Sequence, residues 1–337
     1  MNHLRARAPQ LENSTQLSAY EKLSEKTPSR FAKTYRLIEY YWHPPDSGTL
    51  GSGELGKPVG GHIQGLTSFY SPDGTHHVIV SAVLHGSWRI QEFHWNPSTG
   101  SGVQERELHQ SNDQIWGIAG YSLGPYRHLI LAFVNNPQLV ELRWTGNGPP
   151  ERRVIGDYGA NWGGLSAFTS SDGVAHVAFA KLSADGTCFE LFDLSTTSSG
   201  QRNLSNLGAM DQNIDGFCGF HTPDTKRNLI VCVSNRGHIF QAEWGAGMSP
   251  KVTTPFEPPL TSPPIRWSKC EGIGGFCSPD GVRHIVGGDS DGRVRELWWS
   301  PSSGARDFFT FGQYPYATAT GFYSADGWHH GIALVYG

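Results

Sequence analysis

The chain is poor in charge and has no long apolar run. Only 17% of its 337 residues are charged, and 26 basic against 30 acidic residues give a net charge of −4. A protein that binds polyanions needs clustered cations, so this balance argues against a nucleic-acid partner. No segment approaches the roughly 18 apolar residues of a membrane span, and we expect no membrane insertion. Residues 1–16 are polar and have no apolar segment typical of a secretory signal, which favours a cytoplasmic protein.

Cysteine is also scarce, and the motifs of metal and cofactor chemistry are missing. The five cysteines form neither a Cys-x-x-Cys pair nor the Cys/His spacing of a zinc site. Two pairs of adjacent histidines, His76-His77 and His329-His330, fall on expected strands, where neighbouring side chains point to opposite faces. Each pair is therefore a poor chelate. We find no nucleophile motif, no glycine-rich phosphate loop and no dinucleotide fingerprint, so the sequence predicts neither a metal nor an organic cofactor.

Glycine and aromatic residues are abundant instead. The 42 glycines and the 11 Trp, 12 Tyr and 17 Phe favour short strands joined by tight turns. A run of small residues closed by an aromatic residue, which we call the anchor, recurs about every 50 residues. Small residues on a strand indicate that something approaches closely, as happens where strands crowd around an axis. The anchors are Phe69, Tyr121, Phe168, Phe220, Phe276 and Phe322.

Each repeat continues in the same way. An Asp-Gly turn follows most anchors, then comes an apolar strand opened by His, and then a strand with the pattern Glu-x-x-Trp. Four strands in each of six units predict an all-β, six-bladed β-propeller. The last unit supplies only two strands, so we expect residues 36–42 to complete it and close the ring. Residues 34–337 are therefore predicted to form a single propeller, preceded by an N-terminal arm or disordered tail at 1–33.

The repeated pattern of Asp-Gly-x-x-His, apolar strand and Glu-x-x-Trp resembles the fungal fucose-specific lectins. The resemblance implies fucose sites between blades, made by an Arg that opens the second strand, a Glu about 12 residues later and aromatic rings. The Arg is replaced by His or Asn in every unit, and Arg127, Arg227 and Arg283 stand one residue earlier, on the opposite face of the strand. The acids expected at the Glu position are Glu39, Glu92, Glu141, Glu190 and Glu296.

Two structural roles are expected for these repeated side chains. We expect the histidines to link neighbouring blades through backbone hydrogen bonds, and the Glu-x-x-Trp residues to pack between blades. His cannot reproduce the two-pronged hydrogen bonding of an Arg to adjacent hydroxyls, so the sugar signature is damaged throughout.

One mouth of the central channel should be lined by side chains that differ from unit to unit. The aromatic ones are Trp116, Trp162, Trp267 and Tyr316, and the polar ones are Gln64, Asp215, Glu271, Arg266 and His62. Aromatic walls with a few convergent polar groups are typical of a pocket for one small apolar or aromatic molecule. If Asp215 and Glu271 lie close together, they raise one another's pKa and can act as an acid–base pair.

A lectin-like propeller without the sugar signature and with an asymmetric pocket resembles the hetero-Diels–Alderases of fungal tropolone–sesquiterpenoid biosynthesis. This resemblance implies a cofactor-free cycloaddition of a tropolone quinone methide with a humulene-type alkene in the central pocket. The catalytic candidates are Glu271, Asp215, Arg266 and His62, and the substrate-binding candidates are Gln64, Trp116, Trp162, Trp267 and Tyr316. The alternatives are a fucose- or glycan-binding lectin that uses pockets between blades, and a protein-interaction propeller.

Overall fold

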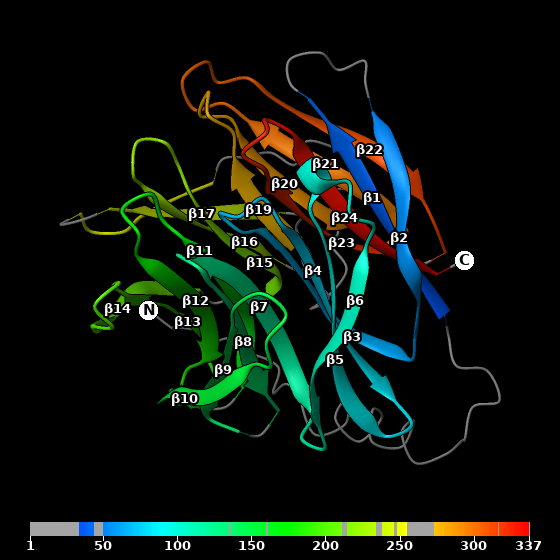
Figure 1. The fold of residues 1–337 in the computed structure, drawn as a ribbon. Coiled ribbons are helices and arrows are strands. Elements are labelled where there is room, and N and C mark those ends of the chain that lie inside the picture. The colour runs from blue at the N-terminus through cyan, green and yellow to red at the C-terminus, as the bar shows by residue number, and fades with distance from the viewer. Residues whose placement is uncertain are drawn as a thin grey trace, which may run out of the picture. The chain divides into compact units, whose positions relative to one another are not determined.

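The fold is a ring of six antiparallel sheets, each of four strands, in a computed structural model of the chain (Figure 1). The predicted six-bladed β-propeller is confirmed. The structure describes residues 34–43, 50–134, 136–159, 161–210, 214–233, 238–245, 248–254, 273–315 and 317–336. The predicted arm at 1–33 lies outside these residues. No helix in the described ranges is long and apolar enough to cross a membrane.

The strands fall into four positions from the channel outward, and we number the blades I to VI from the first inner strand. The inner strands are β3 (His62–Tyr70), β7 (Ile115–Leu123), β11 (Trp162–Thr169), β15 (Ile214–His221), β19 (Ile273–Cys277) and β23 (Ala317–Tyr323). The second strands are β4 (His76–Leu84), β8 (Tyr126–Phe133), β12 (Ala175–Leu182), β16 (Arg227–Val233), β20 (Arg283–Gly288) and β24 (His329–Tyr336).

The third and outer strands complete each blade. The third strands are β5 (Ser87–Trp95), β9 (Gln138–Trp144), β13 (Phe189–Thr196), β17 (His238–Trp244), β21 (Arg293–Trp299) and β1 (Thr34–Trp42). The outer strands are β6 (Gln104–Ser111), β10 (Glu151–Asp157), β14 (Arg202–Met210), β18 (Lys251–Thr253), β22 (Arg306–Gln313) and β2 (Gly51–Gly60). A short 3-10 helix, η1 (Pro97–Thr99), joins the third and outer strands of blade I.

Blade VI closes the ring as the repeat count predicts. Its order is β2-β1-β24-β23, so the first two strands of the propeller pair with the last two. In Figure 1 the blue β1 runs beside the red β24, and Tyr40 of β1 pairs with Gly331 of β24. The outer half of this blade therefore comes from one end of the propeller sequence and the inner half from the other, and their pairing removes an open sheet edge.

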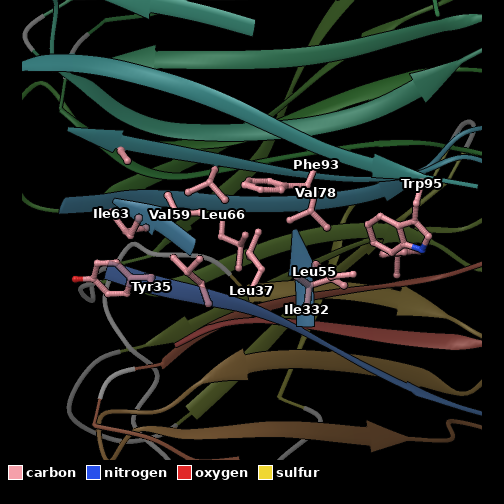
Figure 2. Packing of buried hydrophobic residues seen from close by; sticks show 14 residues of the cluster. Tyr35, Leu37, Leu55, Val59, Ile63, Leu66, Val78, Phe93, Trp95 and Ile332 are labelled. Carbon is pink, nitrogen blue, oxygen red and sulfur yellow. The ribbon is translucent and has the colours of Figure 1, made fainter. Parts of the chain in front are cut away.

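The hydrophobic core lies between the blades, with one cluster at each of the six interfaces. Figure 2 shows the cluster at the closure, where Leu37 and Ile332 of blade VI face Val78 and Phe93 of blade I. The tryptophans of the Glu-x-x-Trp pattern belong to these clusters: Trp95, Trp144, Trp244 and Trp299 each pack between their own blade and the preceding one. The expectation of packing between blades is therefore confirmed for the tryptophans, whereas the acids of the pattern bond within their own blade.

Small residues before each anchor allow the inner strands to crowd around the axis. A Cβ atom on Gly120 would lie 2.6 Å from the ring of Phe69, the anchor of the preceding blade, and one on Gly219 would lie 2.6 Å from the ring of Phe168. Such contacts are far shorter than van der Waals separation, so only glycine fits there. The backbone N–H of Gly120 also donates to Thr67 Oγ1 of the preceding blade at 3.1 Å. Neighbouring blades are thus joined at the axis by ring-on-glycine contacts and hydrogen bonds.

Candidate functional site

The narrow section of the central channel lies near the beginning of the inner strands and contains two of the predicted residues. Trp116 and Asp215 line it, and its volume is about 90 Å³. Asp215 is only 8% exposed. Of the described residues, neither His62, which is exposed at the start of β3, nor the half-buried Gln64 lines this section. Glu271, Arg266, Trp267 and Tyr316 lie outside the described residues, and their contributions stay predictions.

Trp162 lies in the core rather than at the channel. Its ring packs against Phe179, and its Nε1–H donates to the carbonyl of Phe133 in the preceding blade at 3.1 Å. The cause is a β-bulge near the start of the inner strand, where the register shifts between Trp162 and Gly164. Trp162 therefore takes the buried place that Ile115 takes in blade II, and Gly163 takes the place of Trp116.

The wide section of the channel lies at the other end of the inner strands. Its volume is about 490 Å³, and it is lined by the anchors together with the residue that follows each of them. The two sections share the small residues that precede the anchors, among them Gly120, Gly219 and Gly275. Sequence reasoning missed the wide section. The signal was present, because the residues after the anchors differ between blades: Tyr70, Ser122, Thr169, His221, Cys277 and Tyr323.

The histidines that open the second strands form a buried ring of hydrogen-bonded pairs with acids of the same blade. His77 Nδ1 lies 2.7 Å from Glu92 Oε1, and the imidazole stacks on the anchor Phe69 with ring centroids 4.8 Å apart. The same arrangement recurs in other blades, with the pairs His128–Glu141, His176–Asp193, His284–Glu296 and His330–Glu39. Blade IV replaces the pair by Asn228 and Gln241, whose amides hydrogen-bond at 2.7 Å.

This arrangement corrects two expectations. The histidines bond within a blade, so the expectation that they link neighbouring blades is wrong. In blade III the acid is Asp193 rather than Glu190, because the longer turn after β12 moves the register and places Asp193 opposite Ala178. Glu190 lies opposite Lys181 instead, near the end of the strand pair.

A serine in the turn before the second strand forms a hydrogen bond with Nε2, the second ring nitrogen of the histidine. Ser71 Oγ lies 2.9 Å from His77 Nε2 and 2.6 Å from Asp73 Oδ1 of the Ser-Pro-Asp-Gly turn. A serine hydroxyl has a single proton, and an ionised Asp accepts only, so Ser71 donates to Asp73 and can accept from His77. Burial of the turn raises the pKa of Asp73, but hydrogen bonds from Ser71 and Thr75 outweigh it and bring that pKa to about 2.

Arginines one residue earlier make the links between blades. Arg127 of blade II donates to Asp73 Oδ2 in the turn of blade I at 2.5 Å, and Arg227 of blade IV donates to Asp172 of blade III at 2.7 Å. Arg283 of blade V reaches Glu243 of blade IV at 2.7 Å. These arginines lie on the face of the strand opposite to the histidines, as predicted. That face is directed toward the preceding blade.

The buried acids differ in the cation that accompanies them. Arg106 of β6 donates to Glu92 and Arg153 of β10 donates to Glu141, each from the register position directly opposite the acid. Burial raises the pKa of Glu141, yet hydrogen bonds from His128 and Arg153 outweigh it and lower that pKa to about 2. Glu296 faces Phe309 instead of an arginine, and burial raises its pKa to about 8.

None of the five acids in the histidine–acid pairs is open to a ligand. Glu92 is 0% and Glu141 is 1% exposed, and all the acids of the ring are buried under the anchor and second strand of their own blade. A sugar that approaches from solvent cannot reach their carboxylates without opening a blade. The residues that the lectin resemblance would assign to sugar binding therefore serve the interior of each blade in this chain.

One pocket between blades is nevertheless open. It lies between blades IV and V, has a volume of about 460 Å³, and is lined by Lys226, Glu243, Lys251, Arg283 and Trp299 among others. Lys226 Nζ lies 3.3 Å from Glu243 Oε1, so the carboxylate is shared by two cations. The pocket carries an excess of positive charge, which suits an acidic ligand, while Trp299 is only 4% exposed and forms its floor.

No family model and no curated protein sequence matches the chain. Solved structures do match. They include AofleA from Arthrobotrys oligospora, with 10% identity, a TM-score of 0.53 and coverage of 80% of this chain and 78% of that one. The six-bladed fucose-binding lectin of Aleuria aurantia matches with 14% identity, a TM-score of 0.51 and coverage of 81% and 90%. The α-L-arabinofuranosidase Arb93A of Fusarium graminearum matches with 8% identity, a TM-score of 0.53 and coverage of 82% and 93%.

These matches support the lectin-like propeller fold. At such low identity the likeness concerns the fold alone, and the same architecture carries both sugar binding and glycoside hydrolysis in the proteins that match.

Proposed function

We propose that this chain is a cofactor-free biosynthetic enzyme that holds an apolar, partly aromatic substrate in its central channel. The observation that carries the proposal is the closure of the acid positions in all six blades, five by buried histidine–acid pairs and one by an amide pair. The central channel, in contrast, is lined by side chains that differ from blade to blade. A site for one asymmetric molecule requires such differences. Its wide section, about 490 Å³, lies within the ~300–1,000 Å³ range of small-molecule pockets.

The reaction we propose is the hetero-Diels–Alder cycloaddition of a tropolone quinone methide with a humulene-type alkene. Such a reaction needs no redox partner, and the enzyme acts by holding two reactants in register, an effect that can reach ~7–11 kcal/mol. Asp215, buried at the narrow section, would protonate the hydroxyl group of the precursor that leaves as water when the quinone methide forms, with Glu271 as its partner. Arg266 would donate to the carbonyl of the heterodiene, and Trp116, Trp267 and Tyr316 would enclose the substrate. His62 and Gln64 do not line the channel and have no role in this proposal.

The test compares channel variants with a variant of the pocket between blades. Wild-type protein, Trp116→Ala, Asp215→Asn and Lys251→Ala are incubated with humulene and a tropolone precursor of the quinone methide, and the adduct is quantified by chromatography. We expect kcat/KM to fall at least about tenfold for the two channel variants and to stay unchanged for Lys251→Ala, as loss of one transition-state contact predicts. No adduct above background with the wild type, or equal rates for all variants, overturns the proposal.

A glycan-binding function is the second candidate, favoured by the open pocket between blades IV and V. Arg283 and Glu243 provide there basic and acidic side chains that sugar recognition uses, although they occupy register positions other than those of the buried ring. A glycan array separates the two candidates. Binding of acidic glycans that Lys251→Ala abolishes supports this second function, and an empty array excludes it.

A further inference from the structure

Two blades carry a histidine at the position that is arginine in three others. The residue before the second-strand His or Asn is His76 in blade I and His329 in blade VI, against Arg127, Ala175, Arg227 and Arg283 in blades II to V. Side chains at this position look toward the preceding blade, as the Arg127–Asp73 ion pair demonstrates. His76 therefore looks into blade VI, and His329 looks into blade V.

The two histidines lie in equivalent aromatic cages. His76 meets the imidazole of His330 edge-on with ring centroids 4.6 Å apart, and it also contacts Tyr70, Trp95 and Phe322. His329 meets His284 edge-on at 4.5 Å, and it also contacts Tyr323, Trp42 and Phe276. Each cage has a tyrosine and a tryptophan from the same blade and an anchor phenylalanine and a histidine from the preceding one. Two independent interfaces thus repeat one arrangement.

The ring nitrogens in these cages are poorly satisfied. His329 is 1% exposed, and neither of its ring nitrogens has a hydrogen-bond partner among the described residues. His76 is also 1% exposed, and its Nδ1 has no such partner. Buried polar atoms without a partner are rare because desolvation costs about 1–3 kcal/mol for each.

Each unsatisfied histidine lies beside a histidine–acid pair that has no arginine. His76 joins His330 and Glu39, and His329 joins His284 and Glu296, with the ligand atoms of each trio within 4.8 Å of one another. No Lys or Arg side chain in the described ranges forms an ion pair with Glu39 or Glu296, whereas Arg106 and Arg153 serve Glu92 and Glu141. A buried carboxylate needs a cation, so the third histidine appears where the arginine is missing.

We propose that each trio binds one Zn²⁺ ion through two imidazole nitrogens and one carboxylate oxygen. These are ligand types that zinc prefers, at bond lengths of about 2.0–2.2 Å. Tetrahedral coordination places ligand atoms about 3.3 Å apart. The acid and the Nδ1 of its paired histidine, which lie 2.7–2.8 Å apart, would separate slightly, and the third histidine would close by up to about 1.5 Å. Ser278 and Ser324 lie 3.3 Å and 2.9 Å from Nε2 of His284 and His330, which leaves Nδ1 of both rings directed at the acid. Such outer hydrogen bonds are typical of metal-binding histidines.

The two ions would lie on either side of blade VI, the blade that closes the ring. The first trio joins β1 and β24 of blade VI to β4 of blade I, and the second joins β20 and β21 of blade V to β24. The proposed ligands of each ion come from two different blades and not from histidines adjacent in the sequence. For this reason the spacing of residues along the chain gave no sign of a metal site.

Metal content measured on variants tests the proposal. Full-length protein is loaded with ZnCl₂, dialysed against metal-free buffer, and analysed by plasma mass spectrometry. His76→Phe and His329→Phe remove one ligand each and keep an aromatic ring in the cage, so they preserve the packing. His94→Phe is the matched control, because His94 lies beside the pair His77–Glu92 that Arg106 already balances.

We expect two zinc ions per chain in the wild type and in His94→Phe, one in each single variant, and none in the double variant. EDTA should lower the unfolding temperature of the wild type by several degrees and leave the double variant unchanged. A wild type with fewer than two bound ions, or Phe variants that keep both, overturns the proposal. In that case a shared proton between acid and histidine replaces the metal. Neither result depends on turnover, so the proposed enzyme activity is tested separately.

Discussion

Blades I and II differ from blades V and VI in how a buried acid is neutralised, although the backbone of the ring repeats. Glu92, Glu141, Glu296 and Glu39 each lie 2.7–2.8 Å from Nδ1 of a histidine of the same blade. In blades I and II an arginine from the outer strand adds a second contact. In blades V and VI the position opposite the acid holds Phe309 or Gly53 instead of an arginine. A histidine of the next blade, His329 or His76, lies near the acid there. The repeat thus fixes the shape of a blade, while its charge balance is settled locally at each interface.

The intermediate blades follow the same rule. In blade III the acid is shorter, and Trp244 of the next blade donates its Nε1–H to Asp193 Oδ2 at 3.2 Å. In blade IV the acid and the histidine are both replaced by neutral amides, so no cation is needed. Each solution satisfies the requirement that a buried carboxylate have a charged or hydrogen-bonding partner.

The largest effect is expected when the arginine is removed from a blade that uses one. Arg106→Met should lower the free energy of unfolding by about 3–5 kcal/mol, because Glu92 is 0% exposed and loses its cation. The double variant Arg106→Met/Glu92→Gln should recover most of the loss, since no charge is then left in the core. Urea unfolding measures both, and a single variant that costs less than about 1 kcal/mol contradicts the comparison.

Acid should destabilise the arginine-containing blades next in order of size. The pKa of Glu141 is about 2 in the folded chain against an ordinary value of 4.5. A lowered folded pKa contributes stability that is present above pH 4.5 and is lost as the pH falls toward 2, here about 3 kcal/mol. Unfolding curves of wild type and Glu141→Gln between pH 6 and 3 should converge as the pH falls. Parallel curves would show that the Glu141 carboxylate is not responsible for the loss of stability in acid.

Matched amide substitutions should sharpen the contrast between the two kinds of blade. Glu92→Gln should cost about 2 kcal/mol, because the amide loses the charge-assisted bonds from Arg106 and His77. Glu296→Gln, measured with EDTA present, should cost less than about 1 kcal/mol because no arginine is left without its anion. Equal costs for the two substitutions would mean that the arginine contributes nothing.

The smallest effect is expected at the arginine link between blades. Arg127→Met removes the ion pair with Asp73, whose side chain is 55% exposed, so the loss should be about 1 kcal/mol or less. The free energy of unfolding of this variant should depend less on salt concentration than that of the wild type, because only the wild type has an ion pair here that salt can screen. A stability change above about 3 kcal/mol would place this link among the buried pairs.

The fold could be predicted from the sequence because its determinants repeat. The anchors, the Asp-Gly turns and the Glu-x-x-Trp strands recur at the same places in the repeats. Each such place needs either an aromatic side chain or a residue with positive φ, such as Gly74 at +85°. The closure by residues 36–42 followed from counting strands.

The site was predictable only in part, because it depends on contacts between blades and on one bulge. The shift at the bulge sends Trp162 into the core and leaves Trp116 at the channel, although both stand near the start of an inner strand. The trios join His76 to Glu39 and His329 to Glu296, which lie on different blades, so no spacing along the chain connects them. The roles of Glu271, Arg266, Trp267 and Tyr316 stay predictions.

The central claim is that the repeated acids form the interior of the blades and are not sugar sites. Calorimetric titration of the purified chain with α-methyl-L-fucoside, a ligand bound by the Aleuria aurantia lectin, tests it most directly. The account predicts no heat of binding at millimolar sugar, because the acids of all the histidine–acid pairs are buried and paired. Binding of several fucoside equivalents per chain, lost in Glu92→Gln or Glu141→Gln, would contradict it.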